Sequence, residues 1–429
     1  MIFMTTVIIG GGVAGLTAAY ELAKRKERVI VVEKNKELGG LLSSFKTRGA
    51  PIECFYHHLF PFYHEFFSLC GEMGLSKKIV WMPASTGFYY GNRMYRLTSP
   101  LDLMFYRPLG MLEKFSMAKN LLKMRKIADS SKYDNITAKE FILKSTSRTV
   151  YEKVYAPLLR DKFGKYMDEI SAAWFIERMN LRNRRGLKGE KLGYLRGGFY
   201  QFLDRLAEKI KGMGGEIQLN AKINGVGMAK NRINAVYING KRIKTDHVIS
   251  TMPPQELSKV IKLPKEYVRK FAFTFETSVC VILGLDKRLF DYYWINMIEP
   301  ALKFGAVIEH TNFMPLRDYK DHIVYLASYT DKDSKLLKMS AKEVLRLYLA
   351  DLQRVAPDLK LKDVKWWRVC VSPNSVLVYK KGVTTKVRRM GRKTPIKNLF
   401  VCGAFNSYPE GSINESVKGG MECAKLVNK

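Results

Sequence analysis

Residues Thr5 to Ser44 read TTVIIGGGVAGLTAAYELAKRKERVIVVEKNKELGGLLSS, and this stretch decides the fold. The apolar, β-branched run Thr6–Ile9 is typical of a buried strand. An alanine- and leucine-rich helical pattern follows over Leu16–Arg25, and a second apolar run, Val29–Val32, indicates a neighbouring strand. The stretch therefore predicts a strand–turn–helix–strand unit at the start of the chain.

The turn of this unit contains three glycines in G-x-G-x-x-G spacing. Gly10 permits a tight turn, Gly12 lets a pyrophosphate approach the backbone, and Gly15 lets the helix pack closely on the strand. A diphosphate would then lie at the helix N-terminus, where free N–H groups and the helix dipole favour an anion. Glu33, 18 residues past Gly15, ends the second strand, where a carboxylate can accept hydrogen bonds from ribose hydroxyls. The unit therefore predicts a dinucleotide site.

Two further segments bear on which dinucleotide is bound. Gly39 and Gly40 follow Glu33 closely, and a second glycine pair lets another backbone segment approach an extended cofactor. Near the other end of the chain, NLFVCGAFNSYPEGSINESVKGG (Asn398–Gly420) predicts a strand, a glycine-bearing loop and a helix that begins near Ser412–Asn414.

Both segments resemble FAD-dependent enzymes of the amine oxidase, protoporphyrinogen oxidase and phytoene desaturase superfamily. The resemblance implies that the last helix directs its N-terminus at the flavin ring, where its dipole would stabilise negative charge. It implies non-covalent FAD and an oxidase, dehydrogenase or desaturase that transfers a hydride from a hydrophobic or lipid-like substrate to FAD. Cys402 lies in an apolar strand and is expected to be core packing rather than an attachment point. Ala404 departs from the superfamily, many of whose members have an acid there.

The cofactor-binding residues that follow from the motif and the resemblance come from the glycine turn, the strand ends and the last helix. The resemblance further implies that LNAKING (Leu219–Gly225) meets the adenine. The predicted set is Gly10, Gly12, Val13, Ala14, Gly15, Glu33, Lys34, Gly39, Gly40, Leu41, Ile223, Gly403, Ser412, Ile413 and Asn414.

A second hypothesis comes from another branch of the superfamily, the UDP-galactopyranose mutases. The segment YHHLF (Tyr56–Phe60) resembles a strand next to the flavin in those enzymes, and Tyr151–Trp174 is similar to one of their helical segments. This resemblance implies a non-redox, flavin-dependent sugar isomerase as the alternative. A third alternative is a binding protein that retains FAD without catalysis.

No side-chain motif identifies a catalytic residue, so the candidates are those expected near the flavin: His57, His58, His310 and Tyr329. Adjacent residues of a strand face opposite sides, so His57 and His58 could not ligate one ion together. We therefore expect no metal site.

The composition is strongly basic. The 429 residues include 73 Lys and Arg against 40 Asp and Glu, a formal net charge of +33. Such a field attracts anions: nucleic acid, anionic lipid surfaces or phosphorylated substrates. No nucleic-acid motif accompanies the charge, so we expect no nucleic-acid partner. A basic composition common to the whole organism would also explain the charge.

A basic helical pattern over Leu112–Ile127 is where an anionic partner would bind. It places apolar residues among Lys114, Lys119, Lys123, Arg125 and Lys126. The helix could lie on an anionic membrane, or it could only cover the core while its basic face is solvated.

We expect a cytoplasmic protein, attached peripherally to the inner face of the cell membrane if the membrane alternative holds. Met1–Met4 leads directly into the first strand, which leaves no room for a signal peptide. No apolar run approaches the roughly 18–20 residues that span a bilayer. The cysteines show no C-x-x-C spacing, so neither a zinc site nor a disulfide framework is expected.

These patterns together predict an α/β fold in three interwoven parts. A Rossmann-like FAD-binding domain is expected at 1–75, 190–258 and 390–429, a substrate-binding β-sheet domain at 76–99 and 259–389, and a helical lobe at 100–189. A β-hairpin around Gly91-Asn92, a helix at Ala341–Val355 and strands at Phe271–Gly284 and Ile323–Tyr329 are expected inside these ranges.

Overall fold

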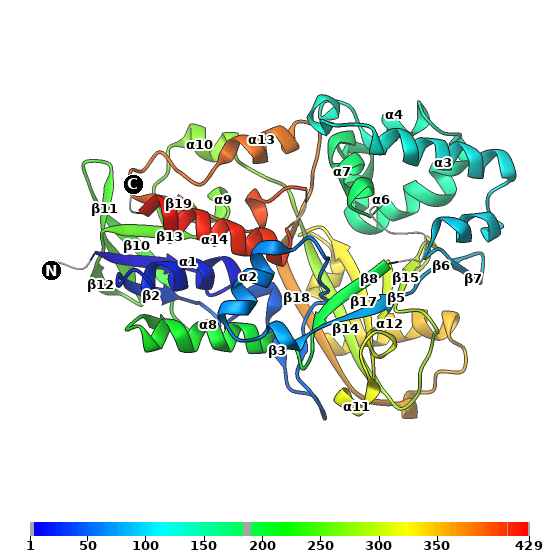
Figure 1. The fold of residues 1–429 in the computed structure, drawn as a ribbon, viewed down its shortest axis with the longest axis horizontal. Helices are drawn as coiled ribbons and strands as arrows, with labels where there is room; N and C mark the ends of the chain where they lie inside the picture. The colour runs from blue at the N-terminus through cyan, green and yellow to red at the C-terminus, as the bar shows by residue number, and fades with distance from the viewer. Residues whose placement is uncertain (1–3, 183–189, 410, 428–429) are drawn as a thin grey trace.

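The computed structural model describes residues 4–182, 190–409 and 411–427. Those parts of the predicted domain ranges that fall on other residues lie outside the described chain. Figure 1 shows a parallel sheet with its helices at the left, a larger sheet at the lower right and a helical lobe at the upper right. The described chain thus combines helices with both parallel and antiparallel strands, as the predicted α/β class requires.

The first sheet is parallel and draws its strands from distant parts of the chain. Within the described residues it has five strands, in the order β19 (Leu399–Val401), β13 (His247–Ser250), β1 (Thr5–Ile9), β2 (Arg28–Val32) and β9 (Glu216–Gln218). The predicted strands at both ends of the opening stretch are therefore confirmed.

Strand β1 shows why both faces of this sheet must be covered. Ile8 packs with helices α1 (Val13–Ala23), α8 (Tyr200–Gly212) and α14 (Ile413–Val427) in one core cluster. Val7 and Ile9 belong to a second cluster on the opposite face, with the antiparallel strands β10 (Ile223–Ala229), β11 (Arg232–Ile238) and β12 (Lys241–Lys244). Burial on both faces explains the uninterrupted apolar run of β1.

The second sheet is larger and mostly antiparallel. Its seven strands within the described chain run in the order β18 (Val364–Leu377), β14 (Phe275–Leu285), β17 (His322–Thr330), β16 (Ala306–Glu309), β15 (Trp294–Met297), β6 (Thr86–Tyr90) and β7 (Arg93–Arg96). Helix α12 (Ala341–Val355) covers one face, where its apolar side chains pack with odd-numbered residues of β14. The even-numbered residues of β14 face the opposite side, towards the site.

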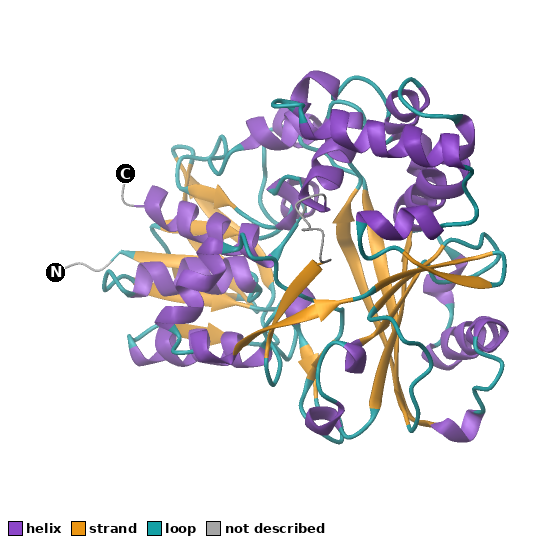
Figure 2. Cartoon of the chain, turned by 45° about the vertical axis from the view of Figure 1, so that its right-hand side comes forward, coloured by secondary structure: helices purple, strands orange, loops and turns teal. Residues whose placement is uncertain are grey.

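The helical lobe crosses the upper part of the molecule above the open end of the large sheet (Figure 2). It contains the 3₁₀ segment η3 (Pro100–Phe105), α3 (Met111–Arg125), α4 (Ala138–Leu143), α5 (Arg148–Val150), a π-helical turn η5 (Tyr151–Tyr155), α6 (Ala156–Phe163) and α7 (Ala172–Arg182). Helices α6 and α7 face the sheet, whereas α3 lies on the outside.

Shorter elements join these parts. They are the pairs β3 (Ser44–Phe45) with β4 (Ile52–Glu53) and β5 (Ile79–Ala84) with β8 (Glu190–Leu195), and the helices α2 (His64–Glu72), α9 (Pro254–Leu257), α10 (Lys265–Lys270), α11 (Leu316–Tyr319) and α13 (Val383–Met390).

Two local predictions are confirmed closely. The helix expected at Ala341–Val355 is α12 with the same bounds. The hairpin is β6–β7, and its two turn residues, Gly91 and Asn92, have φ values of 57° and 56°. Positive φ at both positions is the geometry of a type I′ turn, which matches the twist of the strands.

One other prediction is wrong. The segment YHHLF is not a strand, because only Leu59 forms a bridge, to Gly193, and its neighbours are irregular. The sequence left open whether the apolar residues of the basic helix cover the core or face outward. In α3, Leu112 and Phe115 are 84% and 72% exposed, while Lys114 is buried and donates to the carbonyl oxygen of Met104 at 2.7 Å. The inward face of α3 is therefore partly polar, and large apolar side chains point outward.

Candidate functional site

The predicted glycine turn and the second glycine pair lie against each other. Gly12 is the last residue before α1, and the N–H of Gly39 donates to the carbonyl oxygen of Gly11 at 2.9 Å. A Cβ added to Gly12 would meet nothing nearer than the carbonyl oxygen of Gly39 at 3.8 Å, and one added to Gly40 would lie 3.7 Å from Gly12 Cα. Space bordered by bare backbone therefore lies at the start of α1, whose first N–H groups have no partner within the helix.

Gly10 and Gly15 play a different part, because they allow α1 to pack closely on β1. A Cβ on Gly15 would lie 2.0 Å from the carbonyl oxygen of Gly10, and Gly10 itself has a φ of 108°. Val13 and Ala14, the first residues of α1, are buried above this contact. The turn thus has one glycine that leaves space and two that allow close packing.

Glu33 lies at the end of β2, beside the turn. Its side chain is 6% exposed; Oε2 accepts from the N–H of Gly11 at 2.8 Å and Oε1 accepts from the N–H of Asn35 at 2.9 Å. The carbonyl oxygen of Glu33 accepts from the N–H of Ala221 at 2.9 Å, which brings the predicted adenine segment alongside. Ile223, two residues on, is half-buried, and Lys34 is exposed.

The last helix begins where the sequence predicts. Ser412 precedes α14, and its Oγ accepts from the N–H of Glu415 at 3.2 Å. The side chain of Asn414 turns away to α2: its Oδ1 accepts from the N–H of Phe66 at 3.0 Å and its Nδ2 donates to Glu65 at 2.8 Å. Ser412 and Ile413 line the cavity described next, whereas the Asn414 side chain fastens α14 to α2.

A cavity of about 330 Å³ opens between α14, the large sheet and the helical lobe. Its lining is mainly aromatic and apolar and comes from four parts of the chain. Phe55, Tyr56, His57, His58, Phe60 and Tyr63 belong to the segment after β4; Tyr155, Leu158, Leu159, Asp161, Lys162, Trp174, Phe175, Arg178 and Met179 to the lobe; Ser278, Cys280, Trp294, Asn296, Ser328, Tyr329, Ser375 and Leu377 to the large sheet; Leu41, Ala404, Ser412 and Ile413 to the nucleotide side.

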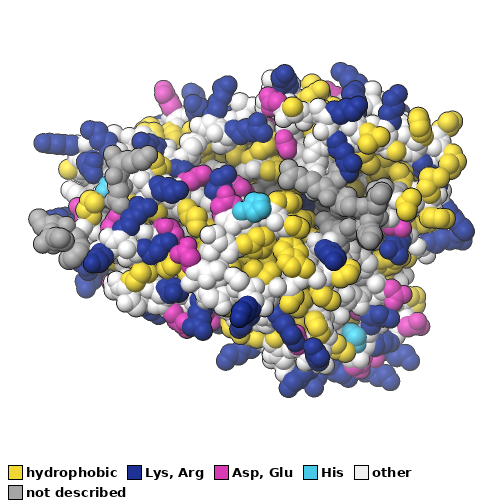
Figure 3. Space-filling model, viewed as in Figure 1, with side chains coloured by type: hydrophobic (Ala, Val, Ile, Leu, Met, Phe, Trp, Pro, Cys, Tyr) yellow, Lys and Arg dark blue, Asp and Glu magenta, His cyan; other side chains and the backbone are white. Residues whose placement is uncertain are grey.

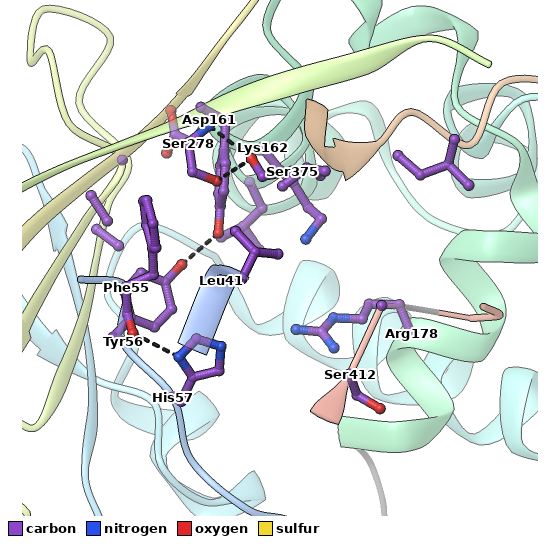
Figure 4. Close-up of a pocket in the computed structure, with 18 of the residues that line it drawn as sticks. Leu41, Phe55, Tyr56, His57, Asp161, Lys162, Arg178, Ser278, Ser375 and Ser412 are labelled. Carbon is purple, nitrogen blue, oxygen red and sulfur yellow. Dashed lines mark hydrogen bonds between the residues drawn. The ribbon is translucent and has the colours of Figure 1, made fainter. Parts of the chain in front are cut away.

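Figure 4 shows how these parts face one another. Arg178 reaches inward from α7, opposite Leu41 and His57, while Asp161, Lys162, Ser278 and Ser375 gather at the end next to the large sheet. Gly403 is buried behind Ala404 and donates its N–H to Oδ1 of Asn406 at 3.1 Å, so Ala404 rather than Gly403 borders the cavity.

Three of the four candidates expected near the flavin line the cavity. Nδ1 of His57 donates to the carbonyl oxygen of Phe55 at 2.7 Å, and burial lowers the pKa of His57 to about 4, so its imidazole is neutral at physiological pH. His58 packs edge-on against Trp294. Tyr329 shares a short hydrogen bond with the hydroxyl of Tyr56. Both histidines can line one cavity because their segment is not a strand.

The fourth candidate, His310, does not line the cavity. It is 3% exposed, and its Nε2 hydrogen-bonds the hydroxyl of Tyr319 at 2.9 Å among the rings of Tyr194 and Tyr325. Burial lowers its pKa to about 3. His310 is a core histidine on the same face of the large sheet as the cavity, but outside the cavity lining.

Two polar residues of the cavity were missed by sequence reasoning. Oδ2 of Asp161 is buried without a hydrogen-bond partner, and burial raises the pKa of this carboxyl to about 7. The hydroxyl of Tyr155, which also lines the cavity, is buried and unpartnered as well. Their spacing of six residues does not place them on one face of an α-helix, so only the fold shows that both line the cavity. Across the described ranges, no group of three or more His, Cys, Asp or Glu is arranged to hold a metal ion.

Known proteins resemble this chain over nearly its whole length. A family model described as flavin containing amine oxidoreductase matches residues 13–428. A 15-cis-phytoene desaturase from an Oncidium hybrid cultivar is 24% identical over 459 residues, covering 99% of this chain and 78% of the relative.

Solved structures show the same fold. A provisionally assigned protoporphyrinogen oxidase from Exiguobacterium sp. 255-15 superposes with a TM-score of 0.81 at 18% identity, over 100% of both chains. Cyclohexylamine oxidase from Brevibacterium oxydans IH-35A gives 0.73 at 15% identity, over 99% of both chains. The family model, which describes oxidoreductases, favours redox chemistry over the sugar-isomerase alternative.

Proposed function

The chain belongs to the flavin-containing amine oxidoreductase family, and we propose that it takes a hydride from a predominantly apolar substrate that it reaches from an anionic membrane surface. As a member of that family it is an FAD-dependent oxidoreductase. The proposal about the substrate rests on the aromatic cavity that extends from the start of α14 to the helical lobe.

The residues of the turn fit the diphosphate and ribose of FAD. We place the diphosphate in the space between Gly12 and the pair Gly39-Gly40, at the positive end of α1. Glu33 is next to the turn, where its carboxylate can accept from the ribose while it holds Gly11. Ile223 would pack on the adenine, an assignment supported by the hydrogen bond from the N–H of Ala221 to the carbonyl oxygen of Glu33.

The cavity end nearest α14 is the proposed place of the flavin ring, held without a covalent bond. FAD supplies the hydride acceptor when it is bound there. The start of α14, at Ser412 and Ile413, would stabilise negative charge at the ring, and Leu41 would pack on it. Neutral His57, with Nδ1 bonded to Phe55, leaves Nε2 as an acceptor at this end.

The remaining cavity favours a substrate that is apolar along most of its length. Trp174, Phe175 and Trp294 supply large aromatic surfaces, and apolar surface of this kind gains roughly 25 cal/mol for each Å² removed from water. Asp161, with its unpartnered oxygen, provides one polar contact for a hydroxyl or amine of the substrate. A small, fully polar substrate would leave the aromatic walls without a partner.

The test is anaerobic reduction of the bound FAD by candidate substrates. Long unsaturated hydrocarbons and hydrophobic amines, delivered in anionic vesicles, are compared with water-soluble polyamines. We expect the flavin to lose its visible absorbance only with an apolar compound, whose product should contain two hydrogen atoms fewer by mass. Reduction by polyamines alone would overturn the assignment of the substrate class.

A matched pair of variants tests whether flavin reduction by the apolar substrate depends on the cavity. Leu158 lines the cavity and Leu143, in the same lobe, is 40% exposed outside it. Leu158→Glu should lower the rate of flavin reduction by the apolar substrate at least tenfold with FAD content unchanged, because burying a charge there is costly. Leu143→Glu should behave as wild type.

The membrane part of the proposal rests on an apolar patch on the outside of the lobe. Within the described chain, seven large apolar side chains between residues 101 and 122 are at least half exposed: Leu101, Met104, Phe105, Met111, Leu112, Phe115 and Leu122. In Figure 3 yellow side chains gather at the right-hand end of the lobe, with lysines and arginines next to them. A contiguous exposed patch of this kind is typical of an interaction surface.

Charge indicates which surface is bound. Lys119, Lys123 and Lys126 are exposed on the same helix as Leu112 and Phe115, and apolar side chains ringed by lysines suit an anionic lipid interface. No helix among the described residues is long and apolar enough to cross a bilayer. We therefore propose peripheral attachment, at the cytoplasmic face of the cell membrane, with the patch entering the headgroup layer.

A further inference from the structure

We propose that Cys54 is a peroxide-reactive thiol and that Cys370 resolves its oxidised form, giving a reversible disulfide beside the cavity. The inference concerns the chain's own thiols and does not depend on the identity of the substrate. It comes from three cysteines, far apart in sequence, that the fold brings together.

Two of the three are cross-strand neighbours. Cys280 of β14 and Cys370 of β18 are directly opposite each other in the antiparallel ladder. Opposed residues of such a ladder have Cα atoms about 4.5–5.5 Å apart. Cys280 lines the cavity, so both side chains lie on the cavity side of the sheet.

The third, Cys54, lies over this pair. It follows β4 directly, and its N–H donates to the carbonyl oxygen of Ser43 at 2.8 Å. The preceding carbonyl, that of Glu53, accepts from the hydroxyl of Tyr325 on β17 at 2.7 Å. Cys54 packs against the core cluster that contains Cys280 and Cys370. The strand next to it, β3, also meets β18, because the guanidinium of Arg368, two residues before Cys370, lies 4.6 Å from the ring centre of Phe45.

The surroundings activate Cys54 selectively. The hydrogen bond from the Cys370 thiol lowers the pKa of Cys54 to about 7 against the opposing effect of burial, with help from the Ser43 hydroxyl and the positive charge of Arg368; Glu37 acts weakly the other way. The thiolate form of Cys54 is therefore favoured relative to that of an ordinary cysteine. The same contact raises the pKa of Cys370, which keeps its proton.

The other cysteines of the described chain lack this combination. Cys54 is half-buried, whereas Cys70, Cys402 and Cys423 are fully buried and Cys280 is 2% exposed. Burial raises the pKa of Cys70 to about 12. An accessible thiolate next to a protonated thiol is the arrangement that peroxide-sensing cysteines use.

The chemistry balances with a hydroperoxide as the oxidant. The Cys54 thiolate attacks the outer oxygen of the peroxide and the O–O bond breaks, so that Cys54 becomes a sulfenic acid. The alkoxide, or hydroxide from hydrogen peroxide, leaves and takes a proton from water. Cys370 then attacks the Cys54 sulfur, the S–O bond breaks, and water leaves with the thiol proton. Two thiols have lost two electrons in total, and the peroxide has gained them.

The bond would act on the site through the segment that follows Cys54. Tyr56 and His57, two and three residues on, line the cavity, so a disulfide to β18 would fix the start of that segment to the sheet. We expect the oxidised form to differ from the reduced form in the rate of flavin reduction rather than in FAD content.

Peptide mapping of the FAD-loaded protein tests the proposal. After treatment with hydrogen peroxide and a non-reducing digest, mass spectrometry should find a peptide that joins Cys54 to Cys370 and that dithiothreitol separates. The cross-link should be absent in Cys54→Ser and in Cys370→Ala and present in the control Cys70→Ser. In Cys370→Ala, dimedone should label Cys54 as a sulfenic acid, which shows reactivity independently of the cross-link.

Iodoacetamide labelling of the untreated protein gives a second readout. The alkylation rate of Cys54 should rise through a midpoint near pH 7, and this midpoint should move upward in Cys370→Ala because the donor is lost. A link between Cys280 and Cys370 instead, a Cys54 midpoint above pH 8.5, or peroxide treatment that leaves Cys54 unmodified would each overturn the proposal.

Discussion

At the scale of single residues, the side chain of Glu33 is held in place by two backbone hydrogen bonds. Its two carboxylate oxygens already accept from the N–H groups of Gly11 and Asn35. We predict that Glu33→Ala weakens FAD binding by about tenfold to a hundredfold without loss of the fold. Hydrogen bonds to a charged group contribute roughly 1.5–3 kcal/mol, and every 1.4 kcal/mol is about tenfold in affinity.

Titration of FAD into the flavin-free variant, followed by quenching of flavin fluorescence, measures this effect. The matched control is Glu37→Ala, which removes the same charge from an exposed position four residues away. Equal affinities for Glu33→Ala and Glu37→Ala would mean that the end of β2 does not hold the ribose.

His310 carries a prediction about pH. In the folded protein, the pKa of His310 is about 3, below its ordinary value of 6.5. As the pH falls from 6.5 towards 3, the imidazole is protonated in the unfolded chain but not in the folded protein, and the folded state therefore loses stability. Between pH 7 and pH 5 this one residue should cost about 2 kcal/mol of unfolding free energy. Urea denaturation of wild type and His310→Gln at both pH values should show a smaller pH effect in the variant; an identical effect would place the imidazole in contact with water.

Residues fixed by local rules could be predicted, and residues placed by long-range packing could not. The roles of Gly10, Gly12 and Gly15 follow from a spacing that one turn enforces. His310 and Asp161 are ordinary in sequence, and their burial depends on which strand or helix stripe meets another far along the chain. Nothing local distinguishes a core histidine from a cavity-lining one.

At the scale of elements, the glycine turn combines one position with open space and one with close packing. An added side chain at Gly12 meets only space, whereas one at Gly15 meets the carbonyl oxygen of Gly10 at 2.0 Å. We predict that Gly12→Val leaves the thermal unfolding temperature of the flavin-free protein unchanged but abolishes FAD retention. Gly15→Ala should instead lower that temperature, since α1 must move away from β1. Loss of the fold in Gly12→Val would contradict the assignment of the open space to the diphosphate.

Element boundaries were predicted well where pattern and capping agree. Ser340 and Glu343 cap α12 reciprocally, and the apolar residues that follow repeat with the helical period, so both ends were evident. The inward face of α3 was not evident, because Lys114 can be buried by donating to Met104 while Leu112 and Phe115 face outward. Apolar periodicity therefore predicts a helix here, but it does not show which side of the helix packs against the rest of the protein.

At the scale of the whole molecule, the patch and the lysines of α3 predict membrane attachment. Wild type should sediment with anionic vesicles at low salt and less with neutral ones. Leu112→Ser with Phe115→Ser should weaken binding to anionic vesicles even at low salt, since each inserted large apolar side chain contributes up to roughly 1.5–3 kcal/mol. Lys119→Glu with Lys123→Glu and Lys126→Glu should weaken it by roughly 1 kcal/mol for each lysine removed, an effect that salt reduces.

Matched controls exist at other surfaces of the molecule. Leu361→Ser removes an apolar side chain that is 69% exposed outside the patch. Lys241→Glu with Arg242→Glu and Lys244→Glu changes the net charge equally on β12, at the other end of the molecule (Figure 1). Controls that lose vesicle binding as much as the α3 variants would mean that overall charge or hydrophobicity, rather than the lobe, is responsible.

The assembly of the whole molecule was the least accessible to sequence reasoning. The parallel sheet takes strands from residues 5–32, 216–250 and 399–401, and the cavity is lined from four separate parts of the chain. Resemblance at the two ends indicated that such parts meet. Which side chains meet inside the cavity depends on register between β14, β17 and β18, which no single stretch encodes.

The most direct test of the central claim is the flavin content of the purified native protein. The protein is precipitated by heat or acid, and the cofactor in the supernatant is identified by mass and quantified against the chain. The FAD-dependent oxidoreductase described here should release about one FAD per chain and leave a colourless precipitate. A native protein that is colourless and takes up no FAD on reconstitution would contradict the account, and flavin that stays with the precipitated chain would contradict non-covalent binding.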